Sequence, residues 1–236
     1  MLPKNFLTPR LAEIMHRIQS CSILCDIGTD HAYIPIAAVD SRRVRHAYAT
    51  DVHQGPVKRA QENIALYGLS KEIEVRLGNG LFPVLDTSAE VVVVAGMGGC
   101  LITEILSQCT EFVSGCKCLL LQPMRETDVV RRYLFEQGWS FEENLVQEDR
   151  RIYHVLTVYP QKPFGSERIT DWDFRFGTFW LETHPLFVEE LKQLIDERKR
   201  IEAGIVTDKA QSLERKENCR IEREYLQKVV EQHETI

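Results

Sequence analysis

The chain has 236 residues, of which 44% are hydrophobic, and a formal net charge of −6. This length and apolar content support one α/β domain with an appendage and exclude wholesale disorder. The acidic balance argues against a protein that coats nucleic acid by broad neutralisation of phosphates, whereas an enzyme with one local basic patch is compatible with it.

Neither a membrane anchor nor a metal site is indicated. No apolar run reaches the ~20 residues of a membrane helix, and residues 1–10 lack the long apolar region of a signal peptide. The seven cysteines form no Cys-x-x-Cys pair and have no histidine at zinc spacing, so we expect free thiols. We therefore expect a cytoplasmic protein that binds no membrane and no metal, and we expect a monomer.

In chain order, the first predicted element is a helix over residues 8–18, where apolar side chains recur at helical spacing. Short apolar runs then alternate with helical patterns. The expected strands are 23–27, 47–50, 73–77, 91–95 and 118–121, and the expected helices between them are 33–40, 56–67, 102–108 and 127–137. Two last strands, 141–146 and 153–159, are expected to form an antiparallel hairpin at the sheet edge.

The alternation of continuously apolar strands with helices indicates a parallel sheet covered on both faces. The closing hairpin is what a methyltransferase that uses S-adenosylmethionine (SAM) adds to this doubly wound pattern, whereas dinucleotide enzymes usually continue with parallel units. We therefore predict an α/β fold with a doubly wound, seven-stranded, Rossmann-like class I methyltransferase sheet.

The composition changes after residue 160. Residues 160–166 have a linker composition, so we expect a domain of 1–160 and a helical module of 161–236. Four apolar residues of the module keep helical spacing: Phe187, Leu191, Leu194 and Ile201. Arg198 interrupts this stripe, a break is expected over 204–208, and a second helix is expected over 213–230. Two antiparallel, coiled-coil-like helices fit best, and a solvated helical tail is the alternative.

Acidic residues and a glycine stand where the first two predicted strands end. Asp26 and the turn glycine Gly28 end the first strand, and Asp51 ends the second. Such a glycine admits a ligand closely, and such an acid accepts hydrogen bonds from ribose hydroxyls. The turn lacks Gly-x-Gly-x-x-Gly, which favours phosphate-free SAM over a dinucleotide. Asp26 would face the positive end of SAM; alternatively, each acid only caps the following helix.

Glycines also cluster after the third and fourth strands, in Gly78-Asn79-Gly80 and Gly96-Met97-Gly98-Gly99. They suggest close approach of backbone to ligand. Asn79 could hold the adenine amino group or belong to an ordinary turn, and Met97 could lie near the methyl donor or only pack. The Asn/Asp-Pro-Pro-aromatic motif of exocyclic-amine methyltransferases is absent, which favours a ring nitrogen as the acceptor.

Four residues are candidates for contact with the substrate. Asp30, His31 and Tyr33 flank the first turn, and Gln122 ends the fifth strand on the same edge, where its amide could read a base. A structural role for His31 is equally open. Four basic clusters, 42–45, 58–59, 131–132 and 150–151, are typical of solvated helix faces, although one or two could track phosphate.

Six strings together resemble the bacterial tRNA (adenine-N1)-methyltransferase family that modifies adenine 22 in the D-arm. They are Asp26-Ile-Gly-Thr-Asp-His-Ala-Tyr-Ile-Pro35, Gly55-Pro56, Gly78-Asn-Gly-Leu81, Ala95-Gly-Met-Gly-Gly99, Leu120-Leu-Gln-Pro123 and Arg175-Phe-Gly177. The resemblance covers nearly the whole chain and is weakest in the C-terminal helices. Four positions depart from the family's usual residues: Thr29 stands for Ser, Asp51 for Glu, Asn79 for Asp and Met124 for Asn.

The resemblance implies transfer of a methyl group from SAM to N1 of an adenine in tRNA, with the C-terminal hairpin helping to hold the tRNA. The implied cofactor-binding residues are Asp26, Gly28, Asp30, His31, Asp51, Val52, Asn79, Gly80, Gly96, Met97 and Gly98, and the implied catalytic residues are Asp30, His31, Tyr33 and Gln122. The alternative from another class is a non-catalytic RNA-binding or SAM-sensing module on a methyltransferase scaffold. A nicotinamide dehydrogenase is disfavoured by the missing glycine fingerprint.

Overall fold

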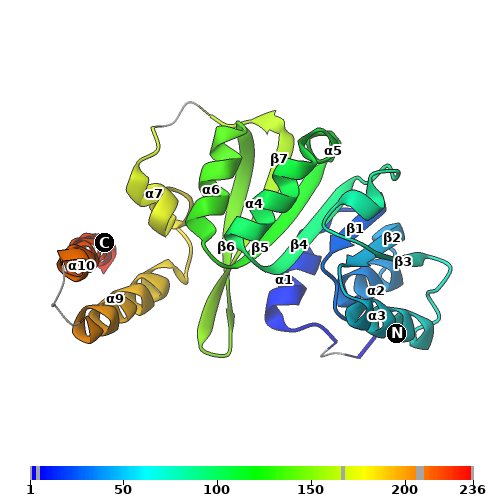
Figure 1. The fold of residues 1–236 in the computed structure, drawn as a ribbon, viewed down its shortest axis with the longest axis horizontal. Coiled ribbons are helices and arrows are strands. Elements are labelled where there is room, and N and C mark those ends of the chain that lie inside the picture. Colours follow the sequence, from blue (N-terminus) through cyan, green and yellow to red (C-terminus); the bar gives the residue numbers. More distant parts are fainter. Residues whose placement is uncertain (1, 4–5, 166–167, 206–209, 235–236) are drawn as a thin grey trace. The chain divides into compact units, whose positions relative to one another are not determined.

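Strands and helices alternate through the first 136 residues of this computed structural model, which describes residues 2–3, 6–165, 168–205 and 210–234 (Figure 1). The strands are β1 Cys21–Ile27, β2 Val44–Asp51, β3 Ile73–Leu77, β4 Val91–Gly98, β5 Cys118–Arg125, β6 Trp139–Glu148 and β7 Arg151–Pro163. The helices are α1 Pro9–Arg17, α2 Tyr33–Asp40, α3 Gln54–Leu66, the 3₁₀ turn η1 Phe82–Val84, α4 Gly99–Gln108, α5 Thr110–Gly115, α6 Thr127–Glu136, α7 Asp171–Phe176, α8 Thr178–Leu181, α9 Phe187–Gly204 and α10 Ala210–Glu234.

The strands form one seven-stranded sheet in the order β3-β2-β1-β4-β5-β7-β6 within the described part of the chain. The first five strands pair in parallel, and β7 pairs antiparallel with both β5 and β6. The predicted doubly wound sheet with a closing hairpin is therefore confirmed.

Helices cover both faces of the sheet, and successive strand residues point to opposite faces, so neighbouring residues are buried in two different cores. Val92 and Val94 of β4 face a core that α4, α5 and α6 cover. Val91 and Val93 face a second core, which α1, α2 and α3 cover. This double burial explains why the strands read as continuous apolar runs rather than as alternating patterns.

Four short elements were not predicted. The 3₁₀ turn η1 and the helices α5, α7 and α8 have between three and six residues each, which is too short to show a helical period. Several strands also run further than their apolar residues, because backbone pairing continues into polar ends; β4 pairs with β5 as far as Gly98↔Arg125, with register shifts around Met97.

The predicted linker over 160–166 is wrong over its first half. Strand β7 continues to Pro163, and the ring of Phe164 packs edge-on against Phe135 at 5.2 Å between centroids. The chain forms two compact units, Met1–Trp180 and Leu181–Ile236, so the first unit extends 20 residues beyond the boundary expected at 160.

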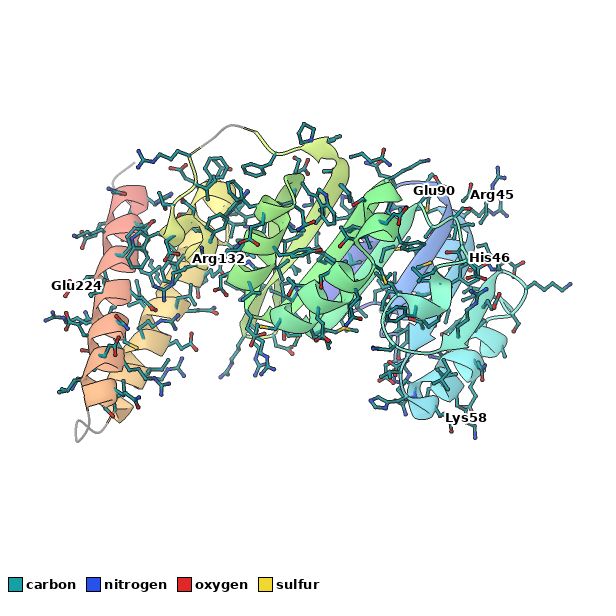
Figure 2. All side chains as sticks on the ribbon, turned by 45° about the horizontal axis from the view of Figure 1, so that its top comes forward. Arg45, His46, Lys58, Glu90, Arg132 and Glu224 are labelled. Atoms are coloured by element: carbon teal, nitrogen blue, oxygen red, sulfur yellow. The ribbon has the colours of Figure 1, made fainter. Side chains whose placement is uncertain are left out.

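Aromatic packing explains why α7 and α8 belong to the first unit. The Trp180 ring stacks on Phe141 of β6 with 4.9 Å between centroids and contacts Phe174 of α7 at 5.8 Å. Arg132 of α6 adds an ion pair to Asp171 and a cation–π contact at 4.8 Å with Phe174 (Figure 2).

A buried ion pair also stabilises the packing of α6 against β6 and α7. Arg131, which the sequence placed on a solvated face, is 1% exposed. It donates to both carboxylate oxygens of Glu143 at 2.8 and 2.7 Å and to the carbonyl of Phe174 at 2.8 Å. Burial opposes ionisation of Glu143, but Arg131 and His154 outweigh it and lower the pKa of Glu143 to about 2.

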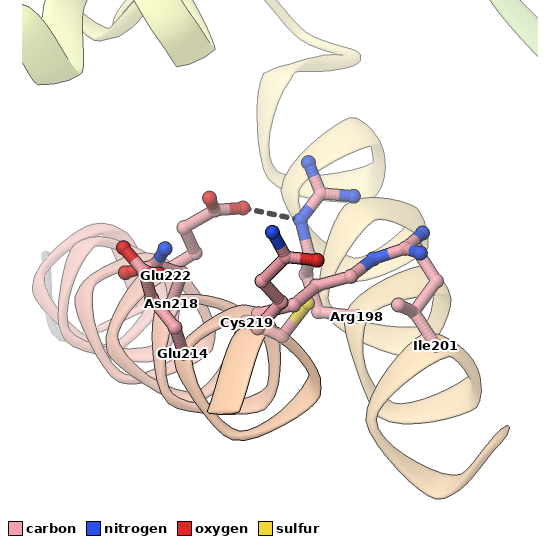
Figure 3. A pocket seen from close by; sticks show the side chains of 8 residues that line it. Arg198, Ile201, Glu214, Asn218, Cys219 and Glu222 are labelled. Atoms are coloured by element: carbon pink, nitrogen blue, oxygen red, sulfur yellow. Dashed lines mark hydrogen bonds and ion pairs between the residues drawn. The ribbon is translucent and has the colours of Figure 1, made fainter. Parts of the chain in front are cut away.

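The second unit is a helical hairpin of α9 and α10. Pairs of contacts run in opposite directions along the two helices, from Phe187 with His233 to Arg198 with Glu222, so the helices are antiparallel as predicted. Arg198 interrupts the apolar stripe because its Nε donates to Glu222 at 2.5 Å, beside a cavity of about 440 Å³ (Figure 3). The predicted break over 204–208 lies mostly outside the described residues.

The described helices include none with the length and apolar character that crossing a membrane requires. All seven cysteines are free thiols, as predicted, and no group of three metal-ligating side chains occurs among the described residues.

A chain ending at Trp180 should stay folded, whereas a chain ending at Gly165 should be destabilised by at least about 3 kcal/mol. The shorter chain loses the Phe174 and Trp180 rings and the carbonyl that Arg131 uses. Urea unfolding of the two truncated chains measures the difference. Equal stability would show that α7 and α8 contribute nothing to the first unit.

Candidate functional site

The candidate residues gather at the carboxyl ends of the parallel strands. The chain goes from β1 outwards to β2 and β3, then returns to place β4 on the other side of β1. The chain therefore leaves β1 and β4 towards opposite sides, and such a switch point is where open α/β sheets bind ligands. Register brings the strand ends level, since Ile27 pairs with Thr50 of β2 and with Val94 of β4.

The first turn is closed by its own hydrogen bonds. Gly28 has a left-handed φ of 78°, which glycine adopts without strain. The amides of Gly28 and Thr29 both donate to the carbonyl of Thr50 at 2.8 Å. These amides are therefore not available to a pyrophosphate, which argues against a dinucleotide site and agrees with the prediction of a phosphate-free ligand.

Asp26 is a buried carboxylate with no cationic partner among the described residues. It is 7% exposed at the end of β1. Burial raises the pKa of Asp26 to about 6, and the hydrogen bond with Thr29 lowers it less. Asp26 does not cap α2, whose N-cap residue is Ala32. A buried acid that no cation neutralises is a candidate for binding a positively charged ligand group.

Met97 contacts the first turn from β4. A Cβ built on Gly28 would lie 1.9 Å from Cε of Met97, so the thioether covers the bare backbone there. Gly96 has φ of 80° and is exposed. The contact between Met97 and Gly28 brings together two of the predicted cofactor residues, one from β4 and one from the turn after β1.

Asp51, Val52, Asn79 and Gly80 form the part of the edge that follows β2 and β3. Asp51 Oδ1 accepts from the amide of His53 at 2.7 Å, but His53 is itself the N-cap residue of α3 and the helix has no side-chain cap, so Asp51 does not cap α3. Its Oδ2 accepts no hydrogen bond within the described residues. Val52 is 55% exposed and Asn79 is exposed. Gly80 has φ of 53°. An apolar side chain and an amide thus lie open at this edge.

Asp30, His31 and Tyr33 form one cluster, as the sequence predicted. The His31 ring stacks on Tyr33 with 5.2 Å between centroids and 17° between planes. His31 Nε2 lies 3.3 Å from Asp30 Oδ2. Arg59 of α3 donates through Nε to Asp30 Oδ1 at 2.9 Å. Asp30 is therefore held in place by a cation from a helix that sequence reasoning did not connect to it.

Gln122 does not point towards a substrate, which corrects its predicted role in reading a base. The side chain is 0% exposed. Its Oε1 accepts from Arg10 Nη1 at 2.6 Å and from the Gly96 amide at 3.1 Å, and its Nε2 donates to the Pro123 carbonyl at 2.9 Å. Gln122 is a positioning residue for the glycine turn of residues 96–99, which spans the end of β4 and the first residue of α4.

Arg10 was missed by sequence reasoning. It lies on α1, 112 positions before Gln122, and its Nη1 is the nearest atom to the position of a Cβ on Gly96, at 3.8 Å. Its Nε is buried without a hydrogen-bond partner in the described structure. Nothing in the local pattern of α1 distinguishes this arginine, because its partners come from β5 and the closing hairpin.

Glu126 is a second residue that sequence reasoning missed. Its backbone approaches Gly99 so closely that a Cβ there would lie 2.1 Å from the Glu126 carbonyl oxygen. Its Oε2 accepts from the amide of Cys100 at 3.2 Å, at the start of α4. That hydrogen bond lowers the pKa of Glu126. Glu126 thus stabilises the N-terminus of α4 and the turn that precedes it.

A protein-family model described as a methyltransferase domain matches residues 7–156. The tRNA (adenine(22)-N(1))-methyltransferase of Bacillus subtilis strain 168 is 33% identical over 153 residues, which cover 64% of each chain. The match thus spans just under two thirds of the length of that relative.

Two solved structures are similar over nearly the whole chain. The Bacillus subtilis m1A22 tRNA methyltransferase TrmK has a TM-score of 0.81 and 27% identity, covering 95% of this chain and 98% of that one. The Streptococcus pneumoniae protein Sp1610, solved in complex with S-adenosyl-L-methionine, has a TM-score of 0.81 and 29% identity, covering 98% and 100%.

Replacing Asp26 by Asn should raise the free energy of unfolding at neutral pH. The folded pKa of about 6 exceeds the unfolded value of about 3.9, so the wild-type chain loses stability as the pH rises through this window and the variant does not. The gain above about pH 7 is up to about 3 kcal/mol. Urea unfolding at about pH 4 and about pH 7.5 measures this difference in stability. An identical pH dependence in both proteins would contradict the raised pKa of Asp26.

Replacing Gln122 by Met should destabilise the chain by about 1–3 kcal/mol, because the Arg10 guanidinium and the Gly96 amide lose their shared acceptor, which is fully buried. Replacing Arg10 by Met is the matched comparison and should destabilise the chain less, since the Gly96 amide still donates its hydrogen bond to Gln122. In the double variant the loss should be smaller than the sum. Denaturant unfolding of the three variants tests this, and additive losses would exclude coupling through the amide.

Proposed function

Since the chain belongs to the methyltransferase-domain family and is TrmK-like, we propose that it transfers a methyl group from SAM to N1 of adenine 22 in the D-arm of tRNA. The observation that carries the proposal is the similarity to the m1A22 tRNA methyltransferase TrmK over 95% of this chain, which includes residues of both units.

The charges and the bare backbone at this edge of the sheet support binding of SAM. Buried Asp26 offers a carboxylate to the ammonium group, and Arg10 brings a cation to the same edge for the carboxylate of the amino acid. Asp51 is suited to the ribose hydroxyls. Exposed Val52 and Asn79 would hold the adenine, while Gly28, Gly80, Gly96 and Gly98 would allow close approach. Met97 lies against Gly28, and we place it beside the methyl donor.

The proposed chemistry needs no strong base. SAM supplies a methyl group activated by its positively charged sulfur, and adenine N1 already carries a lone pair. The residues of the chain therefore act by holding the two reactants in line and by excluding water. The adenine ring gains a positive charge on methylation, which the carboxylates of Asp26 and Asp30 would stabilise.

The stacked pair of His31 and Tyr33 is our candidate platform for the target adenine. Its rings are 17° from parallel, and aromatic rings hold extruded bases by stacking. Asp30 would orient His31, and its ion pair with Arg59 fixes this arrangement. If N1 of adenine 22 is paired in the free tRNA, the base must leave its partner before reaction.

The C-terminal hairpin is the proposed second tRNA-binding part. Cationic side chains lie along both helices, among them Lys199 on α9 and Lys216 on α10. We propose that the chain acts as a monomer in the cytoplasm, where tRNA is found. Loss of the hairpin would then weaken tRNA binding without removing the SAM site, which lies wholly within the first unit.

The chain should methylate an unmodified tRNA transcript at adenine 22 when given SAM with a tritiated methyl group. A transcript with guanosine at position 22 is the control and should take up no label. Replacing Asp51 by Ala should weaken SAM binding by about 1–3 kcal/mol, because ribose hydroxyls lose their acceptor. Nuclease mapping and titration calorimetry are the measurements. SAM binding with no methylation of any tRNA would favour a SAM-sensing module.

A further inference from the structure

The closing hairpin extends beyond the strand that supports it. Strand β7 pairs with β5 only from Leu119↔Val158 to Leu121↔Leu156. Its pairing with β6 continues through Asn144↔Val155 to Glu148↔Arg151. Residues 144–155 therefore form a two-stranded arm with no third strand beside it, about 15 Å long at ~3.3 Å per residue.

The arm projects from the same edge of the sheet as the candidate site. Because β7 runs antiparallel to β5, its first residue, Arg151, lies at the carboxyl end of β5. Figure 1 shows the arm reaching past the ends of the neighbouring strands. Substrate that enters over β4 and β5 would therefore meet the arm.

Contacts with α1 fix the arm relative to the site. Asn144 Nδ2 donates to Glu13 Oε1 at 2.8 Å, and the backbone amide of Arg10 donates to Glu148 Oε2 at 2.9 Å. The Arg10 guanidinium also lies 5.5 Å from the centre of the Tyr153 ring. Since Arg10 also contacts Gln122 beside Gly96, one helix positions both the arm and the glycine turn.

The tip of the arm carries two unused cations. Arg150 and Arg151 are exposed, and neither makes an ion pair or side-chain hydrogen bond in the described structure. Asp149 forms the turn with φ of 56°. The carboxylate of Glu148 is already engaged by α1. In a chain with a net charge of −6, affinity for a polyanion must come from such local sites.

We propose that Arg150 and Arg151 bind backbone phosphates of the tRNA next to the methylated adenine. Guanidinium groups bind phosphate through paired hydrogen bonds, and the arm holds both of them at the rim of the site. This inference rests on the proposed function for the identity of the RNA, and it assigns the arm a role in positioning the substrate.

The test replaces both residues by Ala in the full-length chain and measures tRNA binding over a range of salt concentrations with S-adenosylhomocysteine present. The log–log slope should fall by about one to two, one per lost phosphate contact. In turnover, KM for tRNA should rise about tenfold, while kcat and the affinity for SAM should not change. Replacing both residues by Lys should restore most of the slope, because the charge returns.

A matched control removes two arginines from the opposite edge of the sheet. Arg42 and Arg45 lie where β2 begins, and Arg45 points outward there (Figure 2). Replacing both by Ala changes the net charge equally and should leave slope and KM as in the wild type. An unchanged slope in the Arg150/Arg151 variant, or an equal fall in the control, overturns the proposal. Normal binding without methylation by the wild type would count against the proposed function and not against the arm.

Discussion

The parallel pairing of β4 with β1 is the constraint on which the candidate site depends. Asp26 pairs with Val93 and Ile27 with Val94, so the turns that follow these strands leave the sheet side by side and in different directions. That register places Met97 against Gly28 and keeps Asp26 under the junction, away from water. A slip of one residue would turn every side chain of β4 to the other face of the sheet, and the buried acid, the glycine turn and the methionine would separate.

Buried charge has two different uses in this chain. The Arg131–Glu143 pair, which is fully buried, joins α6 to β6, and the Arg198–Glu222 pair, which is partly buried, joins α9 to α10; each pair holds a specific arrangement of helices or strands. Asp26 is buried to a similar extent, yet it has no cation beside it in the described structure. The pairs are satisfied within the fold, whereas burial without a cationic partner raises the pKa of Asp26 to about 6. The unpaired Asp26 carboxylate therefore lowers the stability of the chain as the pH rises through this value.

The N-terminal helix links parts of the molecule that the sheet alone would leave independent. The Arg10 backbone binds the hairpin at Glu148, and its side chain reaches Gln122, which in turn holds the Gly96 amide. A disturbance of α1 would thus reach both the glycine turn and the arm. This arrangement explains how an antiparallel hairpin, added at the edge of a parallel sheet, can be placed accurately beside the strand ends where ligands bind.

The sequence by itself determined the order and type of the main elements and the strand ends that carry Asp26, Gly28, Asp51 and the two glycine clusters. Those features are local: a strand buried on both faces has a continuous apolar run, and the connection from a strand to a helix contains turn-forming residues. Tertiary structure decided what each polar side chain does. The residues around Gln122 in the sequence are the same whether its side chain faces a base or Arg10. Arg131 has the sequence pattern of a surface residue, and its contacts with Glu143 and with the Phe174 carbonyl show that it is buried. Trp180 lies past an apparent linker, and only its packing on Phe141 assigns it to the first unit. These choices depend on partners far away in the chain, which no local pattern records.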